Sequence, residues 1–383
     1  MRPMTLWLRG FRGALLFGWV PLAAAGLLYA RFKDIPAWAA LPVLAAFLVE
    51  YPFYLVPSSP ILRKHVSGRI LPLFLVASVL LPYLICYAPL GQVHWNAVVR
   101  LAVLALALGL WYLVLPVTAV TDILFLVLLA AVLLGKYFDA IYPAPYPGLK
   151  IAILGQIALI HMSVLVLLGQ RRVHPVGYGF VPNLRDCRIG VLHYLGFLPV
   201  GAAVALPLRA VRLAQQPAPL WKAAGTFLGF LLVIALFEEF LFRGVIQQWM
   251  EEWTFSRTAA LLLTSTIFGL AHLWFRDFPN WRWALIAAIL GWFCGHARNQ
   301  AGSIRAGVLT HALVVTTRAC VTTPARMLPA WLRAWPQNHP RTVAMSAHRQ
   351  LGKLRYQRCA RPKTVEVSSS AAVRLQLHSS SHC

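Results

Sequence analysis

Three stretches of the sequence place ionisable side chains inside apolar runs. The first, VIALFEEFLFRGVIQ, carries Glu238, Glu239 and Arg243. The second, FGLAH, ends at His272, and the third, THALVV, contains His311. An ionised group in a low-dielectric environment costs several kcal/mol unless it is paired, hydrated or protonated. Ionisable residues on neighbouring apolar segments therefore predict a shared polar site.

The two adjacent glutamates are predicted to have different partners. Glu239 and Arg243 are spaced i,i+4, which places them on one face of a helix where they can form an ion pair. Glu238 is rotated by about 100° from Glu239 at 3.6 residues per turn. A structural ion pair thus explains Glu239 but leaves Glu238 without a partner. Glu238 is the acid that we expect to be available for chemistry.

These residue types fit two kinds of chemistry. A carboxylate base with two imidazoles can activate water and stabilise an oxyanion. Alternatively, one glutamate and two histidines can hold a zinc ion that keeps an open coordination position. The HExxH motif of soluble zinc proteases is absent. We therefore favour a site without a metal or other cofactor, with zinc as the alternative.

The composition is that of a membrane protein. Of the 383 residues, 59% are hydrophobic and only 12% are charged, whereas about one quarter of a soluble domain is charged. Apolar runs recur along most of the chain, and a helix needs about 20 apolar residues to cross a bilayer. We predict an all-α fold, a polytopic transmembrane helical bundle of about eight to eleven spans.

The chain divides into three parts by its chemistry. We expect N-terminal transmembrane helices in residues 1–180 and a core that carries the polar motifs in residues 185–320. Residues 321–383 are basic and contain no apolar span, which predicts a disordered tail or the mis-framed end of a gene. The polar exceptions within the first part are Glu50, Asp122, Asp139 and His161.

The net charge of +24 does not indicate a nucleic-acid partner. The basic residues lie between apolar runs and in the C-terminal segment, as the positive-inside rule predicts for membrane proteins. No basic patch is interleaved with aromatic residues in the manner of single-strand binders. The six cysteines form no CxxC pair, so neither a zinc knuckle nor a redox motif is indicated.

The three polar stretches together resemble the CPBP family of intramembrane proteases, which includes the CAAX prenyl endopeptidase Rce1 and bacterial Abi-type proteins. The family pattern is EExxxR, FxxxH and then HxxxN or HxxxD. The segments EEFLFRG and FGLAH match the first two motifs in order. The third segment, GSIRAGVLTHALV, departs from the pattern because Val315 stands where the family has Asn or Asp.

The resemblance implies a CPBP-like core and an endopeptidase of the glutamate type. By motif, Glu238 would be the base that activates water, and His272 would assist it. Glu239 and Arg243 would support the base, and His311 would help to form the oxyanion site. The loss of one oxyanion donor typically costs about 10²–10³ in rate. Val315 cannot donate a hydrogen bond and would therefore lower the rate unless another group replaces it. Thr316 or Thr317 could donate instead, although neither shares the helical face of residue 315.

The expected substrate is a protein or peptide in or near the membrane, such as a C-terminal sorting or maturation signal. The compositional bias towards Ala, Leu, Arg and Trp predicts a multi-pass protein of a bacterial inner membrane. One alternative is a membrane scaffold or immunity protein of the same fold with weak or no catalysis, which Val315 favours. Another is a proton-coupled transporter, although the sequence shows no internal repeat.

Overall fold

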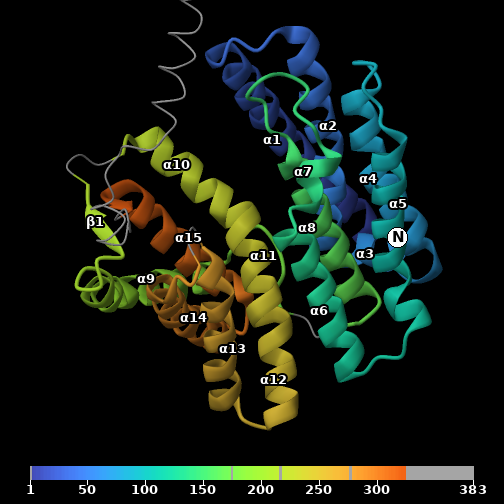
Figure 1. The fold of residues 1–383 in the computed structure, drawn as a ribbon. Coiled ribbons are helices and arrows are strands. Elements are labelled where there is room, and N and C mark those ends of the chain that lie inside the picture. Colours follow the sequence, from blue (N-terminus) through green and yellow to red (C-terminus); the bar gives the residue numbers. More distant parts are fainter. Residues whose placement is uncertain (1, 174–175, 215–217, 276–277, 325–383) are drawn as a thin grey trace, which may run out of the picture. The chain divides into compact units, whose positions relative to one another are not determined.

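The computed structural model describes residues 2–173, 176–214, 218–275 and 278–324, and it is almost entirely helical (Figure 1). The elements before residue 170 are α1 (Arg2–Phe32), α2 (Ala37–Leu55), α3 (Pro60–Val66), α4 (Leu71–Tyr87), α5 (Trp95–Val114), α6 (Ala119–Leu134), α7 (Tyr137–Ile141) and α8 (Ala152–Gly169), with short 3₁₀ turns at Val56–Ser58 and Gly68–Ile70. The predicted all-α fold is confirmed.

The second half of the chain is also helical. Its elements are α9 (Leu184–Ala205), β1 (Val211–Leu213), α10 (Leu220–Gly229), α11 (Ala235–Glu239), α12 (Gln247–Thr254), α13 (Arg257–Ala271), a 3₁₀ turn at His272–Trp274, α14 (Trp281–Ala301), α15 (Ile304–Val321) and β2 (Thr322–Pro324). The two short strands pair antiparallel, with Val211 opposite Pro324. The predicted basic tail lies outside the described residues from position 325 onwards.

Seven helical segments within the described residues are long and apolar enough to cross a membrane. They are Ala37–Ser58, Gly68–Tyr87, Trp95–Val114, Ala152–Gly169, Leu184–Ala205, Leu220–Thr254 and Ile304–Val321. The count is lower than our expected eight to eleven, partly because α6 has 16 residues and α13 has 15, short of the roughly 20 needed to span a bilayer. Large apolar side chains such as Leu73 and Val99 face outwards, as lipid contact requires.

The helix that carries the two glutamates is not a regular α-helix. Residues Leu220–Thr254 form one continuous rod of 35 residues. Two π-helical segments, Phe230–Ile234 and Phe240–Ile246, interrupt it on either side of α11. π-helical turns are rare and are found frequently at functional sites. Glu238 and Glu239 are the last two residues of α11, immediately before the second π-helical segment.

Both halves of the chain pack against this rod, which runs between α8 and the helices α13 to α15 in Figure 1. On the α8 side, Phe240 and Trp249 share one hydrophobic cluster with Leu159. The hydroxyl of Tyr54 in α2 donates to the carbonyl of Leu232 at 2.7 Å. Apolar packing and a hydrogen bond to the first π-helical segment therefore hold the rod against the first half of the chain.

Small residues let the helices of the second half approach closely. A Cβ atom on Gly269 of α13 would lie 2.5 Å from the carbonyl oxygen of Ala284 in α14. A Cβ atom on Gly190 of α9 would lie 2.8 Å from the carbonyl oxygen of Ala306 in α15. Glycine at such crossings permits the backbone contact that membrane helices use in place of a hydrophobic driving force. These glycines therefore allow α13 to pack closely on α14, and α9 on α15.

Two polar clusters explain the isolated ionisable residues of the first half. Glu50 Oε1 lies 2.8 Å from His161 Nδ1, and His161 Nε2 lies 2.9 Å from the Ser78 hydroxyl. The Ser78 hydroxyl also donates to the Leu75 carbonyl at 2.8 Å. Because a hydroxyl has one hydrogen, Ser78 then accepts from His161, and this imidazole cannot act as its base. The cluster links α2, α4 and α8 without forming a nucleophile.

Asp122 is the centre of the second cluster. It accepts hydrogen bonds from the Tyr112 hydroxyl at 2.8 Å and from the Arg171 guanidinium, also at 2.8 Å. These contacts join α5 and α6 to the segment that follows α8. Asp139, by contrast, lies in the short helix α7 and is exposed. The ionisable residues of the first half therefore have structural partners or contact solvent.

Candidate active site

The ion pair predicted within the rod is present and buried. Glu239 Oε2 lies 3.1 Å from Arg243 Nε, and both side chains are at most 1% exposed. The guanidinium also donates to the Gly291 carbonyl at 3.0 Å. It lies over the ring of Phe268, 4.3 Å from the ring centroid. A buried charge is tolerated only when it is paired and hydrogen-bonded, and Arg243 meets this condition.

Two glycines make room for this ion pair. A Cβ atom on Gly291 would lie 3.1 Å from the Arg243 guanidinium. A Cβ atom on Gly307 would lie 3.0 Å from Glu239 Oε2 and equally close to the Cys294 carbonyl oxygen. The carboxylate is thus seated against the backbone of α15, where any side chain at position 307 would press on it.

His311 lies between the two glutamates. Its Nδ1 atom is 2.9 Å from Glu239 Oε1, and its Nε2 atom is 3.8 Å from Glu238 Oε2. Since Glu239 is paired with Arg243 and accepts hydrogen bonds, His311 Nδ1 carries the hydrogen that it donates. In the neutral imidazole, Nε2 is then an acceptor that faces Glu238. Two acceptors separated by 3.8 Å are suited to a single donor, such as a water molecule, that serves both.

Glu238 is the acid that remains open. Its side chain is 30% exposed, against 0% for Glu239. Its Oε2 atom is buried and has no hydrogen-bond partner among the described residues. The sequence predicted this difference between the two glutamates from their helical spacing.

Glu238 and His311 form part of the wall of a cavity of about 440 Å³. Most of its lining residues are apolar and belong to α9, α14 and α15, and two residues of β1 also line it. The lining residues outside the polar group include Phe197, Phe230, Ile286, Leu290, Val314 and Val321. An apolar cavity with a few convergent polar groups is the usual form of a binding site. A carboxylate at its wall can therefore meet a bound substrate.

His272 lines the same cavity. Its Nδ1 atom donates to the Phe268 carbonyl at 2.8 Å, and its ring packs on Phe268 at 4.6 Å between centroids. The neutral ring therefore presents Nε2 as an acceptor. The structure thus brings Glu238, His272 and His311 to one cavity, with Glu239 and Arg243 buried behind them.

Val315, the residue that departs from the family pattern, also lies at the cavity. Val315 lines the wall, as does Thr317, whose hydroxyl lies 2.8 Å from the hydroxyl of Tyr194. Thr316 instead donates to the Ala312 carbonyl at 2.7 Å. Of the two threonines considered as substitute donors, Thr317 is the one that reaches the cavity.

Arg318 supplies a positive charge to the wall, a feature that sequence reasoning missed. Its guanidinium lies 4.8 Å from the ring centroid of Trp283 and 5.7 Å from that of Phe275. Both aromatic residues also line the cavity. Arg318 follows His311 by seven residues on α15, and i,i+7 residues share a helical face. This spacing could have placed Arg318 near the site from the sequence alone.

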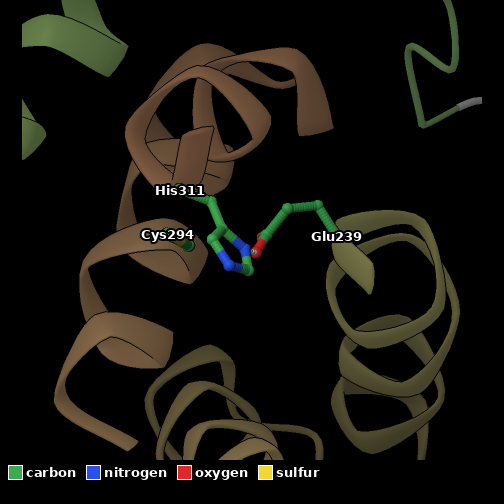
Figure 2. A group of neighbouring side chains, drawn as sticks. All are labelled: Glu239, Cys294 and His311. Carbon is green, nitrogen blue, oxygen red and sulfur yellow. Dashed lines mark hydrogen bonds and ion pairs between the residues drawn. The ribbon is translucent and has the colours of Figure 1, made fainter. Parts of the chain in front are cut away.

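Cys294 is the second residue that sequence reasoning missed. Within the described residues, one group of at least three side chains could hold a metal ion, and it consists of Glu239, Cys294 and His311 (Figure 2). One ligand atom from each lies within 4.8 Å of the others. The sequence analysis considered a zinc site of one glutamate and two histidines. The group found in the structure has Cys294 where that site would have His272.

Comparison with known proteins identifies the part of the chain that carries this site. Residues 220–317 match the family model described as type II CAAX prenyl endopeptidase Rce1-like. Neither a curated protein nor a solved structure matches the chain. The matched segment includes all five candidate catalytic residues and lies within the predicted core of residues 185–320. The family resemblance is confirmed, and the apolar helices make this an integral membrane protein.

Proposed function

We propose, from the membership of residues 220–317 in the Rce1-like family, that this membrane protein is an endopeptidase in which Glu238 activates water. The observation that carries the proposal is the position of Glu238. Its side chain is 30% exposed and lines an apolar cavity, and its Oε2 atom lies 3.8 Å from His311 Nε2. A water molecule that donates to both acceptors would be oriented and polarised for attack.

Hydrolysis would begin with proton transfer from this water to Glu238. The water oxygen attacks the carbonyl carbon of the scissile peptide bond, and the carbonyl oxygen becomes an oxyanion. Glu238 then returns its proton to the leaving amine as the C–N bond breaks. Placing a general base within reach of the reacting water contributes about 10²–10⁴ in rate.

The two histidines would hold the attacking water. His311, whose Nδ1 stays bonded to Glu239 at 2.9 Å, would accept a hydrogen bond from this water through Nε2. His272, whose Nδ1 is held by the Phe268 carbonyl, would accept a hydrogen bond through Nε2 and assist in orienting the water. Glu239 and Arg243 are positioning residues in this mechanism, because Glu239 bonds His311, Arg243 is paired with Glu239, and neither lines the cavity.

The cavity favours a substrate with apolar groups and a negative charge. Its wall accommodates apolar side chains or a lipid-modified residue, the latter in keeping with the prenyl endopeptidase description of the family. Arg318 lines the same cavity and can bind a carboxylate as a charge-assisted hydrogen-bond donor. We therefore propose that substrates are cleaved near a free C-terminus, as in a sorting or maturation signal, and that the protein resides in a bacterial inner membrane.

The second candidate is a scaffold or immunity protein of the same fold with weak or no catalysis. Val315 favours it, because an apolar side chain lines the cavity where the family has a hydrogen-bonding one. The two candidates differ in one measurable respect. A scaffold needs the fold, whereas an enzyme also needs the Glu238 carboxylate.

The experiment compares membranes that contain wild type, Glu238→Gln or Glu252→Gln at equal abundance. Glu252 is an exposed glutamate in α12 and serves as the matched control for the loss of one carboxylate. Mapping of N- and C-terminal peptides should reveal cleavages present with wild type and Glu252→Gln but absent with Glu238→Gln. Identical termini in all three samples would contradict the endopeptidase and favour the scaffold.

A further inference from the structure

Glu239, Cys294 and His311 come from three helices and meet behind the cavity wall. They lie on α11, α14 and α15, and all three residues are at most 3% exposed. Figure 2 shows the Glu239 carboxylate directed at the imidazole of His311, with Cys294 beside them. Sequence separation of more than fifty residues between Glu239 and Cys294 makes this a product of the fold.

The three ligand types are those that bind zinc-like ions. Carboxylate oxygen and imidazole nitrogen bind Zn²⁺ at about 2.0–2.2 Å, and thiolate sulfur binds it at about 2.3 Å. Glu239 Oε1 and His311 Nδ1 lie 2.9 Å apart, so one ion can bond both atoms after a small displacement. The Cys294 sulfur is within 4.8 Å of both ligands, and a side-chain rotation of this size is available to a thiol.

The surroundings suit a bound cation. Glu239 uses Oε2 to bind Arg243 at 3.1 Å, which leaves Oε1 for the ion. Ligating carboxylates in metal sites are commonly hydrogen-bonded in this way through an outer shell. With neutral His311 and a thiol, Glu238, Glu239 and Arg243 together carry one negative charge. A divalent ion that displaces the thiol proton adds one positive charge and leaves the group neutral.

Binding of the ion would also change which nitrogen of His311 carries the hydrogen. The Nδ1 hydrogen now faces Glu239, and an ion at Nδ1 requires it to move to Nε2. The relocated hydrogen would face Glu238 Oε2, which lies 3.8 Å away. The Cys294 proton leaves to solvent, so one proton is released for each ion bound. Nε2 would no longer accept a hydrogen bond from the water that Glu238 activates.

We propose that Glu239, Cys294 and His311 form an inhibitory binding site for a divalent transition-metal ion of the zinc type. The site is separate from any catalytic use of a metal, because the ion occupies the imidazole on which the proposed water depends. His311 contributes to the cavity wall, and the ion would reach the site from there. Binding itself can be tested without substrate, whereas inhibition rests on the proposed function.

The test uses full-length protein purified in detergent and titrated with Co²⁺, which reports thiolate ligation by a charge-transfer absorption band. Wild type should bind one Co²⁺ with this band, and Zn²⁺ should displace it. Cys294→Ala should lose the band and weaken binding at least tenfold. Cys86→Ala removes a buried thiol in α4, remote from the motifs in sequence, and should behave as wild type. Thermal unfolding should show stabilisation by the ion for wild type and Cys86→Ala only.

The outcomes separate the proposals. A band that persists in Cys294→Ala, or wild-type protein that gives no band at millimolar Co²⁺, would overturn the metal site. If Cys294→Ala is poorly folded, Cys294→Ser provides the comparison, since it keeps the size of the side chain and replaces sulfur with a weak oxygen ligand. With a substrate in hand, Zn²⁺ should inhibit wild type at least tenfold more strongly than Cys294→Ala. Binding without inhibition would overturn the inhibitory role of the site and count against the role of His311 in hydrolysis.

Discussion

Glu238 and Glu239 are neighbours in the chain, but their carboxylates have different environments. Glu239 is fully buried and bonded to Arg243 and His311, whereas Glu238 is 30% exposed at the cavity. The end of α11 and the following π-helical segment hold the two side chains in these positions. The difference supports our proposal that Glu239 positions His311 and that Glu238 activates water, and it makes the two residues separable by mutation.

Replacement of Glu239 should primarily reduce stability. Glu239→Gln leaves the buried Arg243 without its counter-charge, and breaking a buried pair by removing one partner costs about 3–5 kcal/mol. We expect a clear fall in the melting temperature of the purified protein. The control is the double variant Glu239→Gln, Arg243→Met, which removes both charges and should recover part of the loss. Equal stability of Glu239→Gln and wild type would contradict the buried pair.

Gly307→Ala should destabilise the protein through Glu239. The new methyl group would lie 3.0 Å from Glu239 Oε2 and from the Cys294 carbonyl oxygen, and overpacking of this kind costs about 1–3 kcal/mol. Gly225→Ala in α10 is the matched control, because no atom lies within 4 Å of its Cβ position. Thermal unfolding should rank Gly307→Ala below wild type and Gly225→Ala at or above it. The reverse order would show that the carboxylate is not seated against α15.

The sequence was sufficient to predict the helical membrane fold and the different partners of the two glutamates. Both inferences depend on local information, namely run length and spacing along one helix. The two π-helical segments were not predicted. The sequence of the second one, FLFRGVI, contains no residue that favours a π-helix over an α-helix. Cys294 and Arg318 were missed for another reason. Their importance arises from packing of α14 and α15 against α11 and the aromatic residues, which no short motif records.

Val315→Asn should increase the rate of hydrolysis. Val315 lines the cavity on the helix that carries His311, and an amide there could donate to the oxyanion as the family pattern implies. Since loss of one such donor costs about 10²–10³, we expect kcat/KM to rise about tenfold or more. Val315→Leu is the control for a change of size without a donor and should give no gain. An unchanged rate for Val315→Asn would indicate that another group, such as Thr317, already serves the oxyanion.

Arg318→Met should weaken the preference for a free C-terminal carboxylate. Arg318 lies against Trp283 and Phe275 at the cavity wall, and a hydrogen bond to a charged group is worth about 1.5–3 kcal/mol. We expect kcat/KM for a peptide acid to fall about tenfold or more, while the corresponding peptide amide is little affected. Arg318→Lys should retain part of the preference. Equal losses for acid and amide would instead assign Arg318 to the packing of the wall.

The central claim is that the Glu238 carboxylate activates the attacking water. The most direct test measures kcat/KM of purified wild type, Glu238→Gln and Glu252→Gln on one cleaved substrate, together with their melting temperatures. We expect Glu238→Gln to unfold at the wild-type temperature and to lose at least about 10² in kcat/KM, while Glu252→Gln keeps its activity. A folded Glu238→Gln enzyme with activity close to that of wild type would contradict the account.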